Sequence, residues 1–200
     1  MTDSVYQRVL GPDIALIRED LRDYFTAGDH AGIGDGTMQV AGSRYRWLRP
    51  ILAFLARQRI LFPEYGTDVR FQITNTPTPN GALHAVRTFY FPGRERPLED
   101  TMRVVDGRLH DFMGKKRGLE IEMQLTVVNG EPIMQSGNQW LHVGKARIRL
   151  PQIATVRVAE SITDSRRSID VRLRSPIIGE WFRYTGTFSY TNQNSNNNAL

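Results

Sequence analysis

The stretch LEIEMQLTVVNG, Leu119 to Gly130, decides the fold class of this 200-residue chain. Apolar and polar residues alternate from Leu119 to Val127, and this period of two is typical of a strand with one buried face. Asn129-Gly130 follows directly and is a strong signal for a two-residue hairpin turn. We therefore predict a hairpin whose return strand runs from about Ile133 to His142, with Gly137 as a candidate β-bulge.

The same pattern continues on both sides of this hairpin. Asp106-Gly107 marks another two-residue hairpin turn, and Pro176 to Gly179 marks a proline-bounded turn before the last strand. Strands that follow one another through short turns pair with their neighbours in an antiparallel sheet. We expect about eight or nine such strands, from about residue 68 onward.

Two amphipathic helices are expected before these strands. Apolar residues recur at spacings of three and four over about 12–27 and again over about 47–62, with Pro12 and Pro50 at positions that a first helical turn tolerates. The glycine-rich segment from Ala31 to Gly42 has no strand before it and no Lys-Ser/Thr after it. A phosphate-binding loop is therefore rejected, and only a short strand is expected there.

These elements predict the α+β class: a strongly curved antiparallel sheet or open barrel of about eight or nine strands, with two N-terminal helices packed on it. A sheet of that many strands has to curl or split. We expect one domain over residues 1–190 and a disordered tail over 191–200, because that tail is polar and of low complexity. Curved sheets of this kind often leave a ligand cavity.

Composition excludes several kinds of protein. The chain has no cysteine, so disulfides, thiolate metal sites and a cysteine nucleophile are excluded. It shows neither a signal peptide nor an apolar run long enough to span a bilayer, so we expect a soluble, cytoplasmic protein. The net charge of +5 comes from arginines spread singly along the strands, such as Arg70 and Arg103, which favours a solvated sheet face over nucleic-acid binding.

No reaction motif stands out, and no metal or cofactor site is predicted. The four histidines lack the spacing of a zinc site, and no serine lies in a G-x-S-x-G elbow. Glu120 and Glu122 point to the same face of one strand. They form either an acid/base pair or part of the outer face, where arginines such as Arg70, Arg103 or Arg172 would pair with them.

Aromatic and methionine residues carry the main functional signal. If they point inward, they line an adaptable apolar pocket, although ordinary core packing is the simpler explanation. Arg87 or Arg183 near the mouth would then hold an anionic head group. The candidate ligand-binding residues are Trp47, Arg87, Phe89, Met102, Met123, Trp140, His142, Trp181 and Tyr184.

Motifs near both ends of the chain carry a family resemblance. They are Tyr6-Gln-Arg-Val-Leu-Gly-Pro-Asp13, Leu150-Pro151, Ile169-Asp-Val-Arg-Leu173, Pro176-Ile-Ile-Gly179 and Tyr184-Thr-Gly186. In this order and spacing they resemble the bacterial family known as domain of unknown function 4166, from about residue 5 to 190. The resemblance implies a domain found alone or joined to NAD(P)-binding, oxidoreductase-like domains. It implies no known activity and no catalytic residues.

Three hypotheses follow. The first is a domain that binds a hydrophobic or amphipathic small molecule, such as a lipid-like or polyketide-like acid, between sheet and helices. The second is a cyclase, isomerase or hydrolase that uses such a cavity with His142, Glu122 or Asp111 as acid or base. The third is an interaction module for an NAD(P)-dependent oxidoreductase. A titratable group that faces the cavity with a shifted pKa would favour the second hypothesis over the first.

Overall fold

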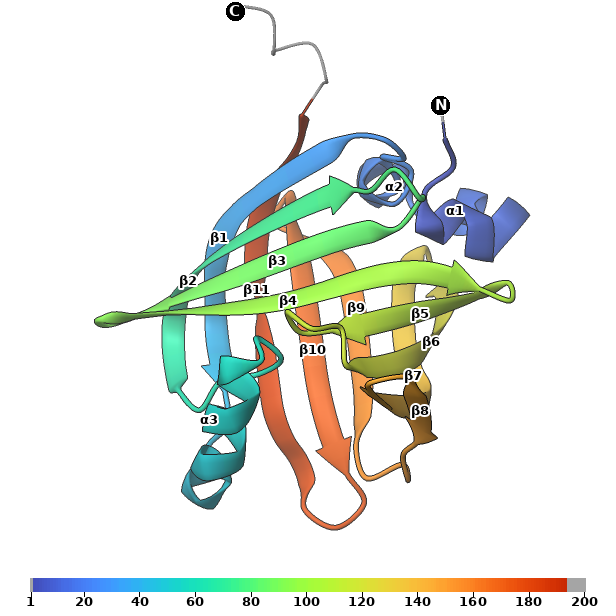
Figure 1. Cartoon of the computed structure of the whole chain (residues 1–200). Coiled ribbons are helices and arrows are strands. Elements are labelled where there is room, and N and C mark those ends of the chain that lie inside the picture. Colours follow the sequence, from blue (N-terminus) through green and yellow to red (C-terminus); the bar gives the residue numbers. More distant parts are fainter. Residues whose placement is uncertain (1, 194–200) are drawn as a thin grey trace, which may run out of the picture.

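The computed structural model describes residues 2–193 and shows a closed, ten-stranded antiparallel β-barrel (Figure 1). The strands pair in the order β6-β5-β4-β3-β2-β1-β11-β10-β9-β7, and a β6–β7 pairing closes the ring, while β8 extends one edge of β7. The strands are β1 Ala31–Gly42, β2 Tyr65–Pro77, β3 Leu83–Phe91, β4 Arg94–Val105, β5 Arg108–Met113, β6 Leu119–Val128, β7 Glu131–Val143, β8 Ala146–Arg149, β9 Thr155–Thr163, β10 Arg166–Ser175 and β11 Gly179–Gln193.

The expectation of an antiparallel, strongly curved sheet is confirmed, but the expected open barrel of eight or nine strands is wrong in detail. The glycine-rich segment forms a longer strand than expected, because β1 spans Ala31–Gly42 and pairs with both β2 and β11. In this strand Gly34 lies opposite Tyr190, and Gly36 lies opposite Phe188. A side chain at Gly36 would collide with the backbone of β11, so glycine permits the close approach of these strands.

The short turns are as expected. Asp106-Gly107 and Asn129-Gly130 both have positive φ angles at their two central residues, as a tight hairpin between twisted strands requires. The register of β6 and β7 shifts between Ile121 and Met123, opposite Gly137 and Asn138. This shift confirms the predicted bulge.

The helices are shorter than expected. The segment expected as one helix over 12–27 contains α2 Glu19–Phe25, preceded by a 3-10 helix at Gly11–Leu16 and by α1 Val5–Leu10. Ser4 starts α1 with a capping box, since its hydroxyl accepts from the backbone of Gln7 while the Gln7 side chain accepts from the backbone of Ser4. Gly11, with φ +54°, then ends α1.

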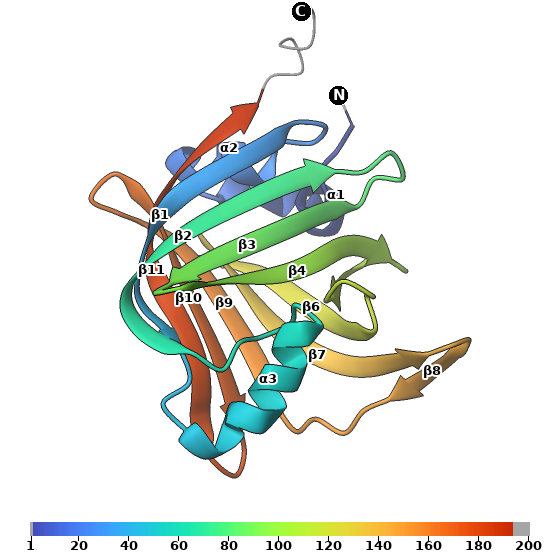
Figure 2. The ribbon, with the colours of Figure 1, turned by 60° about the vertical axis from the view of Figure 1, so that its left-hand side comes forward.

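The second expected helix, over 47–62, is a 3-10 turn at Arg46–Leu48 followed by α3 Arg49–Arg57. Pro50 lies in its first turn as expected, and Arg59, with φ 61°, turns the chain away shortly after its end. The helices occupy opposite ends of the barrel: α1 and α2 cover one end and α3 lies at the other (Figures 1 and 2). No helix among residues 2–193 is long and apolar enough to cross a membrane.

Two apolar clusters fill the barrel. One lies beside α3 and contains the rings of Phe62, Phe71 and Phe89, with centroids about 5 Å apart and tilted or edge-to-face. The other lies beneath α1 and α2 and includes Tyr6 and Phe25. Residues 191–193 of the expected disordered tail belong to β11, and the rest of that tail lies outside the described residues.

We predict that Gly36→Ala destabilises the barrel by about 1–3 kcal/mol, because the added methyl group overpacks the β1–β11 contact. Gly137→Ala is the matched control in another strand, since its new Cβ would lie 3.7 Å from the Glu122 side chain, an ordinary contact. Urea denaturation gives both free energies of unfolding. Equal stability of the two variants would contradict this account of β1.

Candidate ligand-binding cavity

A cavity of about 280 Å³ lies inside the barrel between the two apolar clusters. Its size is near the lower limit of small-molecule pockets. Among its 27 lining residues, all but Arg87, Asp100, Asp111, Gln139 and Glu160 are apolar or aromatic. The apolar part comes mainly from methionines and branched aliphatic residues, which form an adaptable surface.

The cavity wall has a gap where β7 and β9 stop pairing. The two strands pair only between Ile133–Gln135 and Arg157–Ala159, and further along β7 the same edge pairs with β8. The segment 150–154 fills the gap and is held by Gln139, whose carbonyl accepts from Leu150 N at 2.9 Å and whose side-chain amide donates to Ala154 O at 2.7 Å. Ile153 of this segment lines the cavity and is 66 % exposed, so the cavity opens here, at the α3 end.

One arginine and three carboxyl side chains face this cavity from the barrel wall. Arg87 of β3 donates to Asp100 of β4 in a buried ion pair. Asp111 comes from β5 and Glu160 from β9, and both are almost fully buried. Each occupies the inward register of its strand, where its neighbours two residues away are apolar.

This group is incompletely hydrogen-bonded. Arg87 Nε, Asp100 Oδ2, Asp111 Oδ1 and Glu160 Oε2 are buried and have no hydrogen-bond partner among the described residues. Buried polar groups are nearly always paired, because an unpaired one costs about 1–3 kcal/mol. These four unpaired atoms therefore give an otherwise apolar cavity hydrogen-bonding capacity that its own side chains do not use.

The buried carboxyl groups favour their neutral forms. Burial raises the pKa of Glu160 to about 7, although Arg167 and Arg87 oppose the shift. Burial also raises the pKa of Asp111 well above its usual range, and the charge of Asp100 raises it further. The cavity thus holds one ion pair together with two carboxyl groups that can donate as well as accept hydrogen bonds near neutral pH.

Tyrosines complete the polar part of the lining. Burial raises the pKa of Tyr184 to about 12, so its hydroxyl stays protonated. Tyr24 of α2 receives a hydrogen bond from Asn75 Nδ2 at 3.0 Å, and Tyr6 of α1 donates to the sulfur of Met102 at 3.5 Å. The N-terminal helices therefore supply side chains to the cavity as well as covering the barrel.

Five of the nine residues predicted to bind a ligand line this cavity: Arg87, Met102, Met123, Trp181 and Tyr184. The other four lie elsewhere. Trp47 is 60 % exposed on the 3-10 turn before α3, and Phe89 is buried in the aromatic cluster against Phe62 and Phe71. Trp140 and His142 belong to the outer face of the barrel.

The outer face carries a separate cluster around Glu120. Its carboxylate accepts two hydrogen bonds from Arg147 at 2.8 Å each, one from His110 at 2.7 Å and one from His142 at 2.6 Å. The hydrogen bonds from Arg147, followed by those from the histidines, lower the pKa of Glu120 to about 2. Arg147 also stacks over Trp140, so the cluster fastens β8 to the barrel wall.

Glu120 and Glu122 are therefore outer-face residues with basic partners, one of the two alternatives left open by the sequence. The partners differ from those expected, since Glu122 pairs with Arg108 at 2.8 Å. Of the three acid/base candidates, Glu122 and His142 point away from the cavity, and Asp111 points into it.

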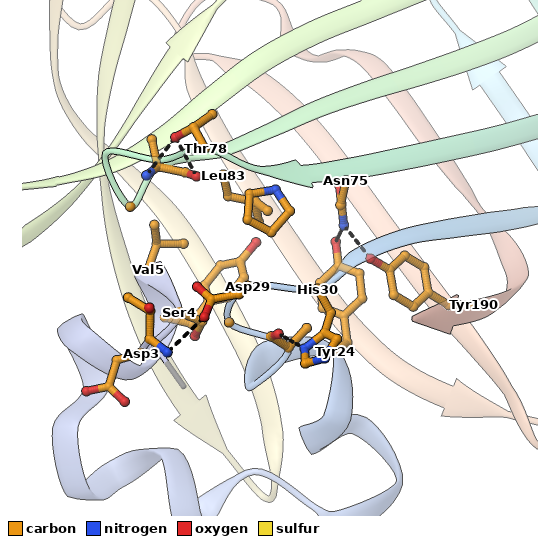
Figure 3. A pocket seen from close by; sticks show the side chains of 17 residues that line it. Asp3, Ser4, Val5, Tyr24, Asp29, His30, Asn75, Thr78, Leu83 and Tyr190 are labelled. Carbon is orange, nitrogen blue, oxygen red and sulfur yellow. Dashed lines mark hydrogen bonds between the residues drawn. The ribbon is translucent and has the colours of Figure 1, made fainter. Parts of the chain in front are cut away.

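A second, smaller hollow lies at the rim beside the N-terminus (Figure 3). Its volume of about 30 Å³ has room for a water molecule but not for a larger ligand. Asn75 bonds both Tyr24 and Tyr190 there, and the backbone of Thr2 donates to Asp29 at 3.1 Å. These contacts tie the N-terminal segment to the barrel.

Comparison with known proteins agrees with the resemblance in the sequence. The model of the family described as domain of unknown function DUF4166 matches residues 17–188. The chain belongs to the DUF4166 family. It is also similar to the uncharacterized protein YndH of Bacillus subtilis (strain 168), with 31 % identity over 178 residues that cover 82 % of this chain and 86 % of that protein.

Two cavity residues of this DUF4166 domain, Asp100 and Glu160, were missed from the sequence. A pattern in the sequence marks both residues. Glu160 follows Val156 and Val158 at a spacing of two, and Asp100 lies between Leu98 and Met102 in the same way. A carboxyl group in the apolar register of a strand is therefore the pattern that would have found them.

The raised pKa of Glu160 predicts how the stability of the domain depends on pH. Its pKa is about 7 in the folded domain and close to 4.5 when unfolded, so the native state binds more protons between these values. Stability therefore falls as pH rises from 4.5 to 7, by up to about 3 kcal/mol at 1.4 kcal/mol per pKa unit. Urea denaturation between pH 4.5 and 8 should show Glu160→Gln losing less stability over this range than the wild type. Parallel pH profiles would contradict the assignment.

Proposed function

We propose that this DUF4166 domain binds a hydrophobic or amphipathic small molecule inside the barrel. The observation that carries the proposal is the set of four buried, unpaired polar atoms of Arg87, Asp100, Asp111 and Glu160 in an otherwise apolar cavity. Apolar walls with a few convergent polar groups are the usual form of a small-molecule site. The walls would hold the ligand's hydrocarbon part, and the polar atoms would orient its head.

The charged residues of the cavity restrict which polar head group the ligand can carry. Arg87 already has a carboxylate partner in Asp100, and two more carboxyl groups share the cavity. A ligand carboxylate would therefore find no unpaired cation among the described residues that line the cavity, and burying a charge without a partner is costly. We therefore propose a neutral head that both donates and accepts hydrogen bonds: a hydroxyl, or the protonated form of a lipid-like or polyketide-like acid.

A pair of neighbouring substitutions in β9 tests this proposal. Val158 lines the cavity, and Ala159 points to the other side of the strand. Val158→Trp should fill the cavity and weaken binding of the neutral fluorescent probe N-phenyl-1-naphthylamine about tenfold or more, which is about 1.4 kcal/mol. Ala159→Trp adds the same ring outside and should leave the affinity unchanged. Equal affinities of the two variants, or a wild type that binds no probe, would contradict the proposal.

A cavity-based enzyme is the second candidate, and a specific observation favours it. Glu160 and Asp111 face the cavity, and burial brings the pKa of Glu160 to about 7, where a general acid or base works best at neutral pH. Such a group could move a proton on a bound substrate, as in an isomerase. A titratable group of this kind is what we expected of the enzyme rather than of a simple binding domain, and a deuterium-exchange experiment tests for proton transfer directly.

Deuterium exchange separates the two candidates. Organic solvent would extract the lipid-like molecules bound to the purified protein. These molecules would then be incubated with the protein in deuterium oxide, extracted again, and measured by mass spectrometry for deuterium content. An enzyme that moves a proton at carbon should add deuterium in the wild type and not in Glu160→Gln. No deuterium uptake with the wild type would leave binding alone. The third hypothesis, docking to an NAD(P)-dependent oxidoreductase, stays a prediction from the family resemblance.

A further inference from the structure

Helix α3 and the 3-10 turn before it, beside the cavity mouth, carry two apolar stripes. Leu48, Leu52 and Leu55 face the barrel, where Leu55 lines the cavity. A second stripe, Trp47, Ile51 and Phe54, has the same helical spacing of four and three and faces outward, with exposed fractions of 60 %, 58 % and 59 %. Contiguous exposed apolar side chains on a soluble domain mark an interaction surface.

Two other segments add exposed apolar side chains at the same end of the barrel. The β10–β11 turn carries Ile177, which is 92 % exposed, and the segment between β8 and β9 carries Ile153, which is 66 % exposed. Both segments lie at the α3 end, opposite α1 and α2 (Figures 1 and 2). We call Trp47, Ile51, Phe54, Ile153 and Ile177 the mouth surface.

Positive charge lies along the α3 part of the mouth surface. The stretch from Ser43 to Pro63 contains five arginines and no aspartate or glutamate. Arg46, Arg49 and Arg57 are exposed and form no ion pair with a carboxylate in the described part of the chain. A helix with exposed Trp and Phe beside unpaired arginines has the composition of a helix that lies in a membrane interface.

We propose that the mouth surface docks on an anionic lipid bilayer, with Trp47, Ile51 and Phe54 entering the interface and the arginines meeting the acidic head groups. The charge favours this occupant over a second copy of the chain, because pairing two mouth surfaces would bring the arginine clusters together. It also places the cavity entrance against the bilayer. That consequence rests on the proposed function: the ligand would then be a molecule that dissolves in the membrane.

Co-sedimentation with vesicles tests the docking. The wild-type protein should bind vesicles of 70 % phosphatidylcholine and 30 % phosphatidylglycerol at low salt, bind pure phosphatidylcholine weakly, and lose binding at high salt. Trp47→Ser and Phe54→Ser should each weaken binding about fivefold or more. Arg49→Glu should do the same, since each basic residue near an anionic surface contributes about fivefold.

Matched controls lie at the opposite end of the barrel. Leu16→Ser removes a side chain with the same 60 % exposure as Trp47, and Arg166→Glu makes the same charge change on an exposed residue of the β9–β10 turn region. Both should bind vesicles like the wild type. Binding of N-phenyl-1-naphthylamine should stay unchanged in all five variants, so a failure of docking is distinguishable from a failure of ligand binding.

The docking proposal is overturned if the wild type does not bind the anionic vesicles, or if the mouth and control variants bind alike. It is also overturned if light scattering shows a dimer that Phe54→Ser dissociates and no vesicle binding, because the mouth surface would then be an interface between copies of the chain.

Discussion

Strand β7 pairs with β6 along one edge and with β9 along the other, and this double pairing closes the barrel. Closure removes the sheet edges, which otherwise present unpaired backbone groups. It also encloses a volume that the side chains do not fill completely. This edge of β7 pairs with β9 over only three residues and then pairs with β8. The segment 150–154 therefore completes the wall, and the cavity opens beside that segment.

The enclosed charges have an energetic cost that packing alone does not explain. Replacing a buried ion pair with apolar residues of the same size is often neutral or stabilising, and unpaired buried polar atoms add a further penalty. The barrel places Arg87, Asp100, Asp111 and Glu160 around one space while its other walls stay apolar. The Glu120 cluster on the outer face differs in this respect, because its carboxylate is fully paired and serves to hold β8.

Local pattern in the sequence predicted much of the sheet. The alternation around Leu119, the Asn129-Gly130 turn and the Gly137 bulge all appear as expected, because each depends on neighbouring residues only. Closure was not predicted, because it depends on pairings between strands that are distant in the sequence. The length of β1 was underestimated, because its glycines resemble a loop. The α1 capping box, Ser4 to Gln7, was present in the sequence and was missed.

Part of the candidate site was predictable, because the alternation along a strand shows which residues point inward. Met102, Met123 and Tyr184 follow the inward register of their strands, so their positions at the cavity follow from period two. Trp140 and His142 were chosen by residue type rather than by register, and they lie on the outer face. The inward register of Asp100 and Glu160 was visible as a charged residue among apolar ones, but the sequence alone did not show that their strands meet around one space.

A high-resolution crystal structure of the protein as purified tests the central claim most directly, which is that the cavity is a ligand site. We predict continuous electron density along the apolar wall, ending within hydrogen-bond distance of Glu160 or of the Arg87–Asp100 pair. Density for water molecules alone, with each of the four unpaired atoms bonded to water or to a neighbouring side chain, would contradict the claim.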